Sequence, residues 1–201
     1  MSIPMQSIAK PNTDSSLKFD IPAIESTLER AQTDSGKALL DLIEASPVLL
    51  VFLRHAGCTF CREALGDIAA IRHEIESSGT RIVLVHMGDR AEIRTVIARY
   101  KLSDLERICD PEQRLYDAFG LLKGSWRQLY GPKVWIRGVI VGLFRGHGLN
   151  KPVVDATQMP GVFYIDKAWI VRRFRHKSAA DRPCYTDLCH DSAQTHFEDT
   201  Q

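Results

Sequence analysis

Two cysteines separated by two residues are the part of this sequence with the clearest chemistry. Cys58 and Cys61 follow the apolar run 48–53 through the short segment 54–57. This arrangement predicts a strand that ends at Leu53 and a helix that begins near the cysteines. Two thiols one helical turn apart lie close enough to form a disulfide, and a helix N-terminus stabilises a thiolate. The spacing therefore predicts a redox-active dithiol.

The order of the two cysteines suggests their roles. In such a loop the first sulfur faces solvent near free backbone N–H groups, whereas the second lies about one turn inside the helix. We therefore expect Cys58 to be the attacking thiolate and Cys61 to be the resolving thiol. The neighbouring side chains Arg54, His55 and Arg62 are expected to add positive charge that lowers the pKa of Cys58 further.

Two other interpretations of the cysteine pair stay open from the residues alone. The two thiols form half of a zinc site, or they are an inert buried pair. A zinc site needs a second Cys or His pair, for which the C-terminal segment offers Cys184, Cys189 and His190. We favour the redox interpretation, which requires no metal and no bound cofactor.

The elements around the dithiol indicate an α/β fold. Strands are predicted at 48–53, 82–85, 107–109, 161–166 and 169–174, the last two as a hairpin. Helices are predicted after Cys61, at 93–100 and at 112–119, from apolar residues at three- and four-residue steps and from cap residues. Strands that alternate with helices and end in a hairpin give a three-layer sandwich, with a central mixed sheet and helices on both faces.

Composition limits the class of protein more than its activity. The 201 residues are 44% hydrophobic and carry a net charge of +1 with interspersed signs, unlike a nucleic-acid-binding face. Residues 1–11 lack the pattern of a secretory signal, and the apolar stretch 134–144 is too short to span a membrane. Five irregularly spaced cysteines are typical of a reducing compartment with one reactive pair. We therefore expect a cytoplasmic protein that binds no nucleic acid.

The chain is expected to contain one domain with flexible ends. Residues 1–22 are expected to be a flexible lead-in, 23–188 the domain and 189–201 a flexible tail. Within the domain, an insertion near 122–150 mixes aromatic and basic residues and is amphipathic if it forms a helix. This insertion either covers the domain's own sheet, forms a homodimer interface or contacts a membrane surface.

Longer motifs carry a resemblance to a known family. They are VFLRHAGCTFCRE (51–63), DPEQRLYDAFGL (110–121), PGVFYID (160–166) and HKSAADRP (176–183). Over about residues 30–188 the chain resembles the peroxiredoxin-like proteins of the AhpC/TSA superfamily, in particular the branch of selenoprotein L and the peroxiredoxin-like 2 proteins. The resemblance implies a thioredoxin-like fold and a thiol-dependent antioxidant or disulfide-exchange role. In selenoprotein L both motif positions carry selenium, and they fall on Cys58 and Cys61.

The resemblance also implies a substrate groove. Thioredoxin-like folds place a cis-proline beside the dithiol, and Met159-Pro160 occupies that place before the strand 161–166. A proline at the first residue of a strand is also common for backbone reasons alone. We expect Pro160 to form one wall of the groove, together with Gly57 and Thr59 of the dithiol loop.

Two positions depart from ordinary peroxiredoxins. Those proteins carry a Thr or Ser three residues before the reactive cysteine and an Arg before the strand 161–166, where this chain has His55 and Pro160. Both side chains donate hydrogen bonds to the peroxide, and preorganised donors stabilise the breaking O–O bond. His55 and Arg54 are the candidates to replace them.

The other three cysteines have less defined roles. Cys109 lies in a predicted strand and is expected to be a small core residue. Cys184 and Cys189 fall in a polar C-terminal segment, where they either remain free or resolve a sulfenic acid on Cys58. From the resemblance, the motif 181–183 is expected to fold back near the site.

These observations together predict a thiol oxidoreductase. Cys58 attacks a peroxide or disulfide substrate, Cys61 resolves the intermediate to an intramolecular disulfide, and a dithiol reductant such as a thioredoxin or glutathione system regenerates the pair. Two alternatives stay open. One is a disulfide reductase without peroxidase activity, and the other is an interaction module in which the dithiol is a redox sensor.

Overall fold

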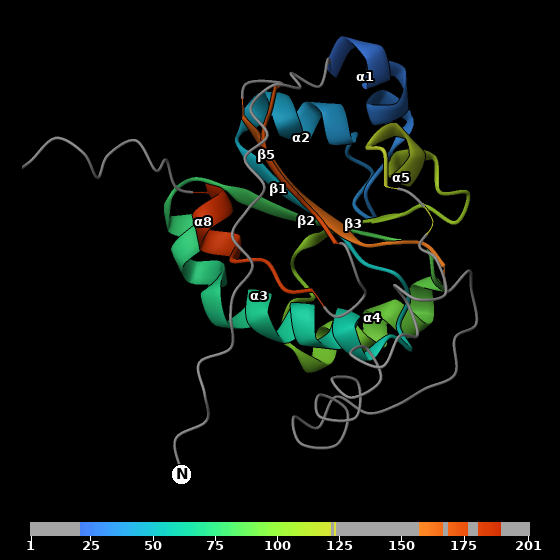
Figure 1. Ribbon diagram of the computed structural model, residues 1–201, viewed down its shortest axis with the longest axis vertical. Coiled ribbons are helices and arrows are strands. Elements are labelled where there is room, and N and C mark those ends of the chain that lie inside the picture. The colour runs from blue at the N-terminus through green and yellow to red at the C-terminus, as the bar shows by residue number, and fades with distance from the viewer. Residues whose placement is uncertain (1–20, 122, 124–156, 167–168, 177–180, 190–201) are drawn as a thin grey trace, which may run out of the picture.

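A five-stranded sheet forms the centre of the computed structural model, which describes residues 21–121, 123, 157–166, 169–176 and 181–189 (Figure 1). Its strands are β1 (Val48–Phe52), β2 (Arg81–His86), β3 (Glu106–Cys109), β4 (Gly161–Asp166) and β5 (Trp169–Arg175). The order across the sheet is β3-β2-β1-β4-β5. β1, β2 and β3 are mutually parallel, whereas β4 pairs antiparallel with both β1 and β5. The sheet is therefore mixed, and the predicted hairpin is confirmed.

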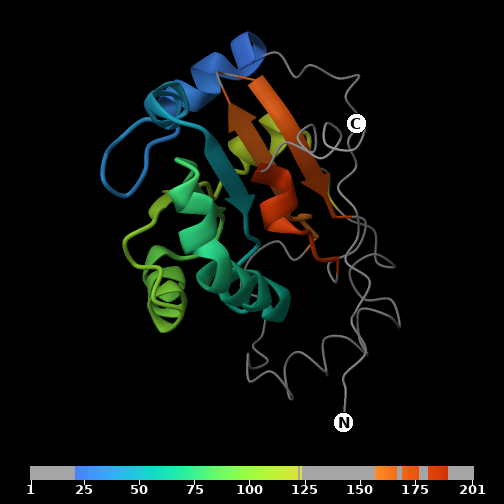
Figure 2. The same cartoon turned by 90° about the vertical axis from the view of Figure 1, so that its left-hand side faces the viewer.

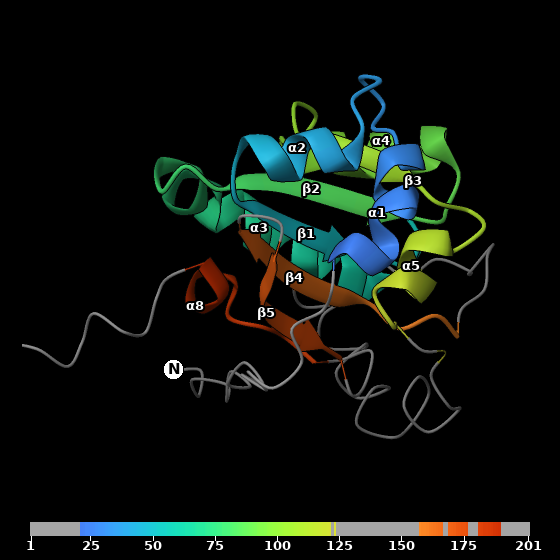
Figure 3. The same cartoon turned by 90° about the horizontal axis from the view of Figure 1, so that it is seen from above.

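Helices cover both faces of this sheet (Figure 3). One face carries α1 (Ile21–Arg30), α2 (Leu39–Ala45) and α5 (Arg114–Ala118), and the other carries α3 (Thr59–Ser77), α4 (Arg90–Arg99) and α8 (Tyr185–Cys189). Successive residues of β1 alternate between the two layers, with Leu49 and Val51 toward α3 and with Leu50 and Phe52 toward α1. The predicted three-layer, thioredoxin-like sandwich is confirmed.

Local residues explain where the helices begin and end. In α3 the buried Leu65, Ile68 and Ile75 recur at helical spacing, and Gly79 leaves the helix with a φ of +82° that favours glycine. The Asp110 carboxylate accepts hydrogen bonds from backbone N–H groups at the start of α5, at 3.1 and 2.8 Å. This helix is shorter than predicted, because Gln113 adopts a left-handed φ of 61° and the helix begins only after it.

The C-terminal segment differs from its prediction. The sequence predicts a polar tail around Cys184 and Cys189, but residues 185–189 form α8, in which Tyr185, Leu188 and Cys189 are buried. Their spacing of three and four residues gives α8 an apolar face that packs on α3. A helix of five residues is too short for this spacing to stand out in a sequence.

Several predictions fall outside the described residues. They concern the lead-in up to residue 20, most of the 122–150 insertion and the tail from residue 190. Among the helices that are described, none is long and apolar enough to cross a lipid bilayer.

Candidate active site

The dithiol lies just after the end of β1, which is the central strand of the sheet, at the start of α3. Cys58 immediately precedes α3, and Cys61 lies in the first turn of that helix. Both residues are buried, with exposed fractions of 6% and 4%. The burial of Cys58 corrects the expectation that its sulfur faces solvent. Neighbouring side chains cover it, and they are described below.

Hydrogen bonding and charge divide the two thiols into different protonation states. The pKa of Cys58 falls from 9.0 to about 6, because a hydrogen bond from Cys61 and the charge of Arg54 outweigh the burial that raises it. Burial raises the pKa of Cys61 well above its usual value. At pH 7 Cys58 is therefore mostly thiolate, whereas Cys61 keeps its proton. This asymmetry suits an attacking and a resolving thiol.

Arg54 contacts both cysteines from the end of β1. Its guanidinium Nη1 lies 3.8 Å from Cys58 Sγ, and its backbone N–H donates to Cys61 Sγ over 3.1 Å. The whole side chain is buried, so the attraction between the cation and the thiolate is only weakly screened. The structure brings this predicted site residue to the sulfur.

His55 does not supply the positive charge expected of it. Burial, followed by the charges of Arg54 and Arg62, lowers the pKa of His55 to about 4, so the imidazole is neutral at pH 7. Its backbone carbonyl accepts a hydrogen bond of 3.0 Å from the N–H of Cys58. Arg62 donates through Nε to the carbonyl of Ala56, also at 3.0 Å. Both residues thus brace the dithiol loop through the backbone.

A small cavity of about 30 Å³ opens on Cys58. Its walls come from the end of β1, the first turns of α3, Pro160 with the start of β4, His176, and the C-terminal residues 181–183 and Tyr185. Pro160 lines this cavity, and the Met159–Pro160 peptide bond is trans rather than the expected cis. Gly57 and Thr59 flank Cys58 in sequence but are not part of this cavity wall.

The C-terminal segment folds back over the dithiol, as the resemblance implied. Asp181, Arg182 and Pro183 all line the cavity, and the Arg182 guanidinium pairs with Asp67 of α3. The red helix α8 lies beside α3 (Figure 2). Its Tyr185 also lines the cavity. The segment therefore forms part of the site rather than a separate tail.

Sequence reasoning missed several residues of this site. Glu63 and Asp67 line the cavity from α3, and His176 lines it while its Nδ1 lies 3.0 Å from the carbonyl oxygen of Pro160. Tyr116 is fully buried and donates its hydroxyl to the carbonyl of Leu53, which fixes the end of β1 just before the dithiol loop. His176 and Tyr116 belong to motifs that carried the family resemblance, and that was the signal available for them.

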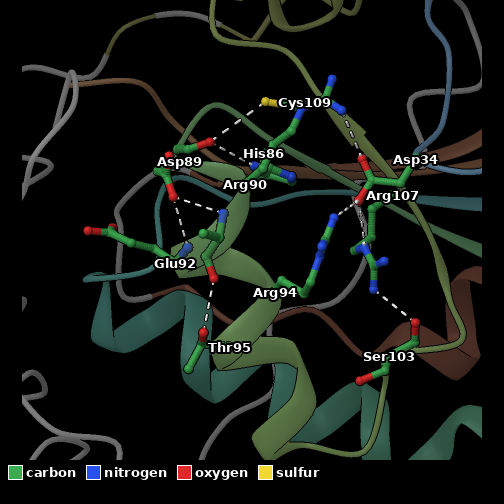
Figure 4. Close-up of polar contacts among 12 residues, drawn as sticks. Asp34, His86, Asp89, Arg90, Glu92, Arg94, Thr95, Ser103, Arg107 and Cys109 are labelled. Carbon is green, nitrogen blue, oxygen red and sulfur yellow. Dashed lines mark hydrogen bonds and ion pairs between the residues drawn. The ribbon is translucent and has the colours of Figure 1, made fainter.

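The other three cysteines lie in different surroundings. All five cysteines of the chain are free thiols. Cys109, at the end of β3, is only half-buried rather than a core residue, and its Sγ donates to the Gly88 carbonyl, which His86 also contacts (Figure 4). Burial raises the pKa of Cys189 to about 12, which makes this thiol a poor nucleophile.

A zinc site is the alternative use of the cysteine pair that needs further ligands nearby. Within the described ranges, no three His, Cys, Asp or Glu side chains group closely enough to hold a metal ion. His190, one of the candidate ligands, lies outside those ranges.

A mixed sheet whose central strand ends beside a CxxC pair at a helix N-terminus defines the chain as a protein of the thioredoxin-like fold. The chain belongs to the AhpC/TSA family, whose sequence profile matches residues 20–174. This membership confirms the broader resemblance and supports a thiol-dependent redox function. The narrower branch of selenoprotein L remains a prediction.

Two solved structures have folds similar to that of this chain. A mutant of peroxiredoxin Q from Xanthomonas campestris matches with a TM-score of 0.54 at 15% identity, over 75% of this chain and 83% of that one. Peroxidoxin BcpB from Mycobacterium tuberculosis matches with a TM-score of 0.53 at 13% identity, over 90% of this chain and 93% of that one. At these identities the likeness shows the fold.

A relative with a similar sequence matches a shorter stretch of this chain. The chloroplastic thioredoxin-like protein AAED1 of Arabidopsis thaliana is 27% identical over 84 residues, which are 42% of this chain. The matched stretch spans only 34% of that relative's own length.

Proposed function

We propose that this protein is a peroxiredoxin-like thiol oxidoreductase that reduces a peroxide or a disulfide through Cys58 and Cys61. The observation that carries the proposal is the asymmetric, hydrogen-bonded thiol pair, in which the pKa of Cys58 is lowered and that of Cys61 is raised. A nucleophile that is ionised at neutral pH stands beside a protonated partner. The charge of the Cys58 thiolate helps to raise the pKa of Cys61, and that contribution is lost once Cys58 has reacted, so Cys61 then gives up its proton more easily and can resolve the product.

With a peroxide as the substrate, the reaction proceeds in two steps. The Cys58 thiolate attacks one peroxide oxygen, the S–O bond forms as the O–O bond breaks, and the leaving alkoxide or hydroxide takes up a proton. Cys61 then attacks the sulfenic sulfur, forming the Cys58–Cys61 disulfide and releasing water. An external dithiol reductant, such as a thioredoxin or glutathione system, reduces the disulfide by thiol exchange.

Arg54 is the proposed replacement for the two donors that ordinary peroxiredoxins have at other positions. A peroxide oxygen within bonding reach of Cys58 Sγ also lies near the Arg54 guanidinium, whose Nη1 is 3.8 Å from that sulfur. The cation can therefore donate to the oxygen as charge develops on it during O–O cleavage. His55 is buried and neutral, so Arg54 is the stronger candidate.

A disulfide reductase without peroxidase activity is the second candidate. The absence of the usual Thr and Arg donors at the positions of His55 and Pro160 favours it. In that reaction Cys58 forms a mixed disulfide with the substrate, and Cys61 displaces it. In either case we propose a cytoplasmic location, a homodimer as an option for assembly, and membership of the selenoprotein L branch.

Mass spectrometry after one equivalent of hydrogen peroxide tests the proposal. The expected product has lost two hydrogen atoms in the peptide that carries both Cys58 and Cys61. Cys58→Ser is expected to abolish peroxide consumption with a dithiol reductant, whereas the matched control Cys109→Ser should consume peroxide like the parent. Peroxide turnover that survives in Cys58→Ser would show that another group is the nucleophile. An oxidised peptide that contains Cys184 instead would assign resolution to the C-terminal segment.

A further inference from the structure

We infer that the ion pair between Arg182 and Asp67 determines substrate size at the dithiol, by holding the segment 181–189 over Cys58. This pair, here called the clasp, admits oxidants as small as hydrogen peroxide and excludes peptide disulfides while it is closed. The inference rests on the proposed function, because it concerns the substrate of the same thiol pair.

The segment 181–189 covers the dithiol directly. Residues 181–183 and Tyr185 line the cavity at Cys58. Tyr185, Leu188 and Cys189 belong to the same buried apolar cluster as the two reactive cysteines. Figure 2 shows α8 packed against α3 on this face of the sheet. The burial of Cys58 therefore depends on a segment more than 120 residues further along the chain.

The clasp is a partly buried ion pair with two hydrogen bonds. Arg182 Nε donates to Asp67 Oδ2 over 2.6 Å, and its Nη2 donates to the second carboxylate oxygen, so the contact is bidentate. Arg182 Nη1 also lies 4.0 Å from Glu63 Oε1. Glu63 and Asp67 stand one turn apart on α3, where two carboxylates repel each other, and Arg182 offsets that repulsion. The exposed fraction of the Asp67 side chain is only 15%, which limits screening by water.

A second contact anchors the far end of the segment. Arg172 of β5 donates through Nη1 to the carbonyl of Leu188 over 3.1 Å. Loss of the clasp therefore removes the contact that ties Arg182 to α3 at the cavity, while α8 keeps its attachment to β5. This arrangement allows the cavity to open without displacement of the whole C-terminal segment.

The size of the closed cavity limits what reaches the thiolate. A volume of about 30 Å³ accommodates one or two water-sized groups, which matches the two oxygen atoms of hydrogen peroxide. A peptide disulfide must place one sulfur against Cys58 and extend chain on both sides of it. Cys58 is 6% exposed, so the closed form leaves little of its surface open to that approach.

Two neutral thiol reagents of different size test the clasp without relying on turnover. The small reagent is methyl methanethiosulfonate, and the bulky one is 2,2′-dithiodipyridine. We expect Asp67→Asn to raise the ratio of the Cys58 reaction rates, bulky reagent over small reagent, about tenfold. The reason is that loss of a bidentate charged pair increases the population of the open form. Both rates are measured on the full chain, with the other cysteines identified by peptide mapping.

A matched pair on the same helix supplies the control. Arg72 of α3 makes a bidentate contact with Asp104, at 2.9 and 2.7 Å, and this pair is absent from the cavity wall. Asp104→Asn removes one carboxylate charge, as Asp67→Asn does, and should leave the ratio of the two rates at the parental value. Arg182→Gln removes the other partner of the clasp and should give the same ratio as Asp67→Asn. With two independent clasp variants, the test still works if one of them fails to fold.

The outcomes separate this inference from the proposed function. An unchanged ratio in both clasp variants, or an equal change in Asp104→Asn, overturns the role of the clasp. A parent protein that forms no disulfide with hydrogen peroxide overturns the peroxide reaction but leaves the ratio of reagent rates as an independent result. If the clasp sets substrate size, the ratio of the rate with hydrogen peroxide to the rate with cumene hydroperoxide should be smaller in the clasp variants than in the parent.

Discussion

Removal of the Cys61 thiol is expected to raise the pKa of Cys58. The pKa of Cys58 falls from 9.0 to about 6, and the hydrogen bond from Cys61 is the largest cause. A lowering of three pKa units corresponds to about 4 kcal/mol in favour of the thiolate. If Cys61 supplies at least a third of it, Cys61→Ala raises the pKa of Cys58 to about 7 or above, and the thiolate fraction at pH 7 falls to about half or less.

Alkylation of Cys58 by iodoacetamide across pH 4–10 measures this change. The rate follows the thiolate fraction, so it rises with pH and reaches half of its plateau near pH 6 in the parent and at or above about pH 7 in Cys61→Ala. Cys61→Ser is the matched control, because its hydroxyl keeps a hydrogen-bond donor at the same place. Its midpoint should lie between the other two. Identical midpoints for the Ala and Ser variants, both at the parental value, would refute the assignment of the hydrogen bond as the main cause.

Two further predictions concern stability. Burial lowers the pKa of both His55 and His86 from 6.5 to about 4, so the unfolded chain binds more protons between these values and the free energy of unfolding decreases as the pH falls through that window. Urea unfolding at pH 7 and pH 4.5 should differ by several kcal/mol, at most about 3 for each histidine, and equal stabilities would contradict their burial as neutral groups. Gly161→Ala should cost about 1–3 kcal/mol, because an added Cβ would lie 2.5 Å from Leu121 Cδ2, whereas at Gly88 the nearest atom is 3.6 Å away and the same substitution should cost less. Equal losses in the two alanine variants, measured by urea unfolding at pH 7, would contradict this steric argument.

Local patterns made much of the fold predictable from sequence. The strand 48–52 is apolar at every position because both faces of the sheet are covered, and the helix after Cys58 shows its buried stripe at three- and four-residue steps. The dithiol was predictable for the same reason, since two residues of spacing within one helical turn determine the distance between the thiols. These features depend on residues close together in sequence.

Other features depend on tertiary contacts and could not be predicted in this way. The pair between Arg182 and Asp67 joins residues 115 positions apart, and no local pattern specifies it. The neutral state of His55 follows from its burial, which its position beside Arg54 gave no reason to expect. The short helix at 185–189 is stabilised by packing on α3 rather than by its own length.

The contact between Arg54 and the dithiol has a consequence for the reduction potential of the pair. The guanidinium and the Cys61 hydrogen bond stabilise a thiolate that exists only when the dithiol is reduced, because the Cys58–Cys61 disulfide carries no charge. Each contribution that makes Cys58 a better nucleophile therefore also shifts the potential to more positive values, by about 30 mV for every 1.4 kcal/mol. The interactions that favour attack on the substrate thus also favour the reduced form of the protein over the disulfide.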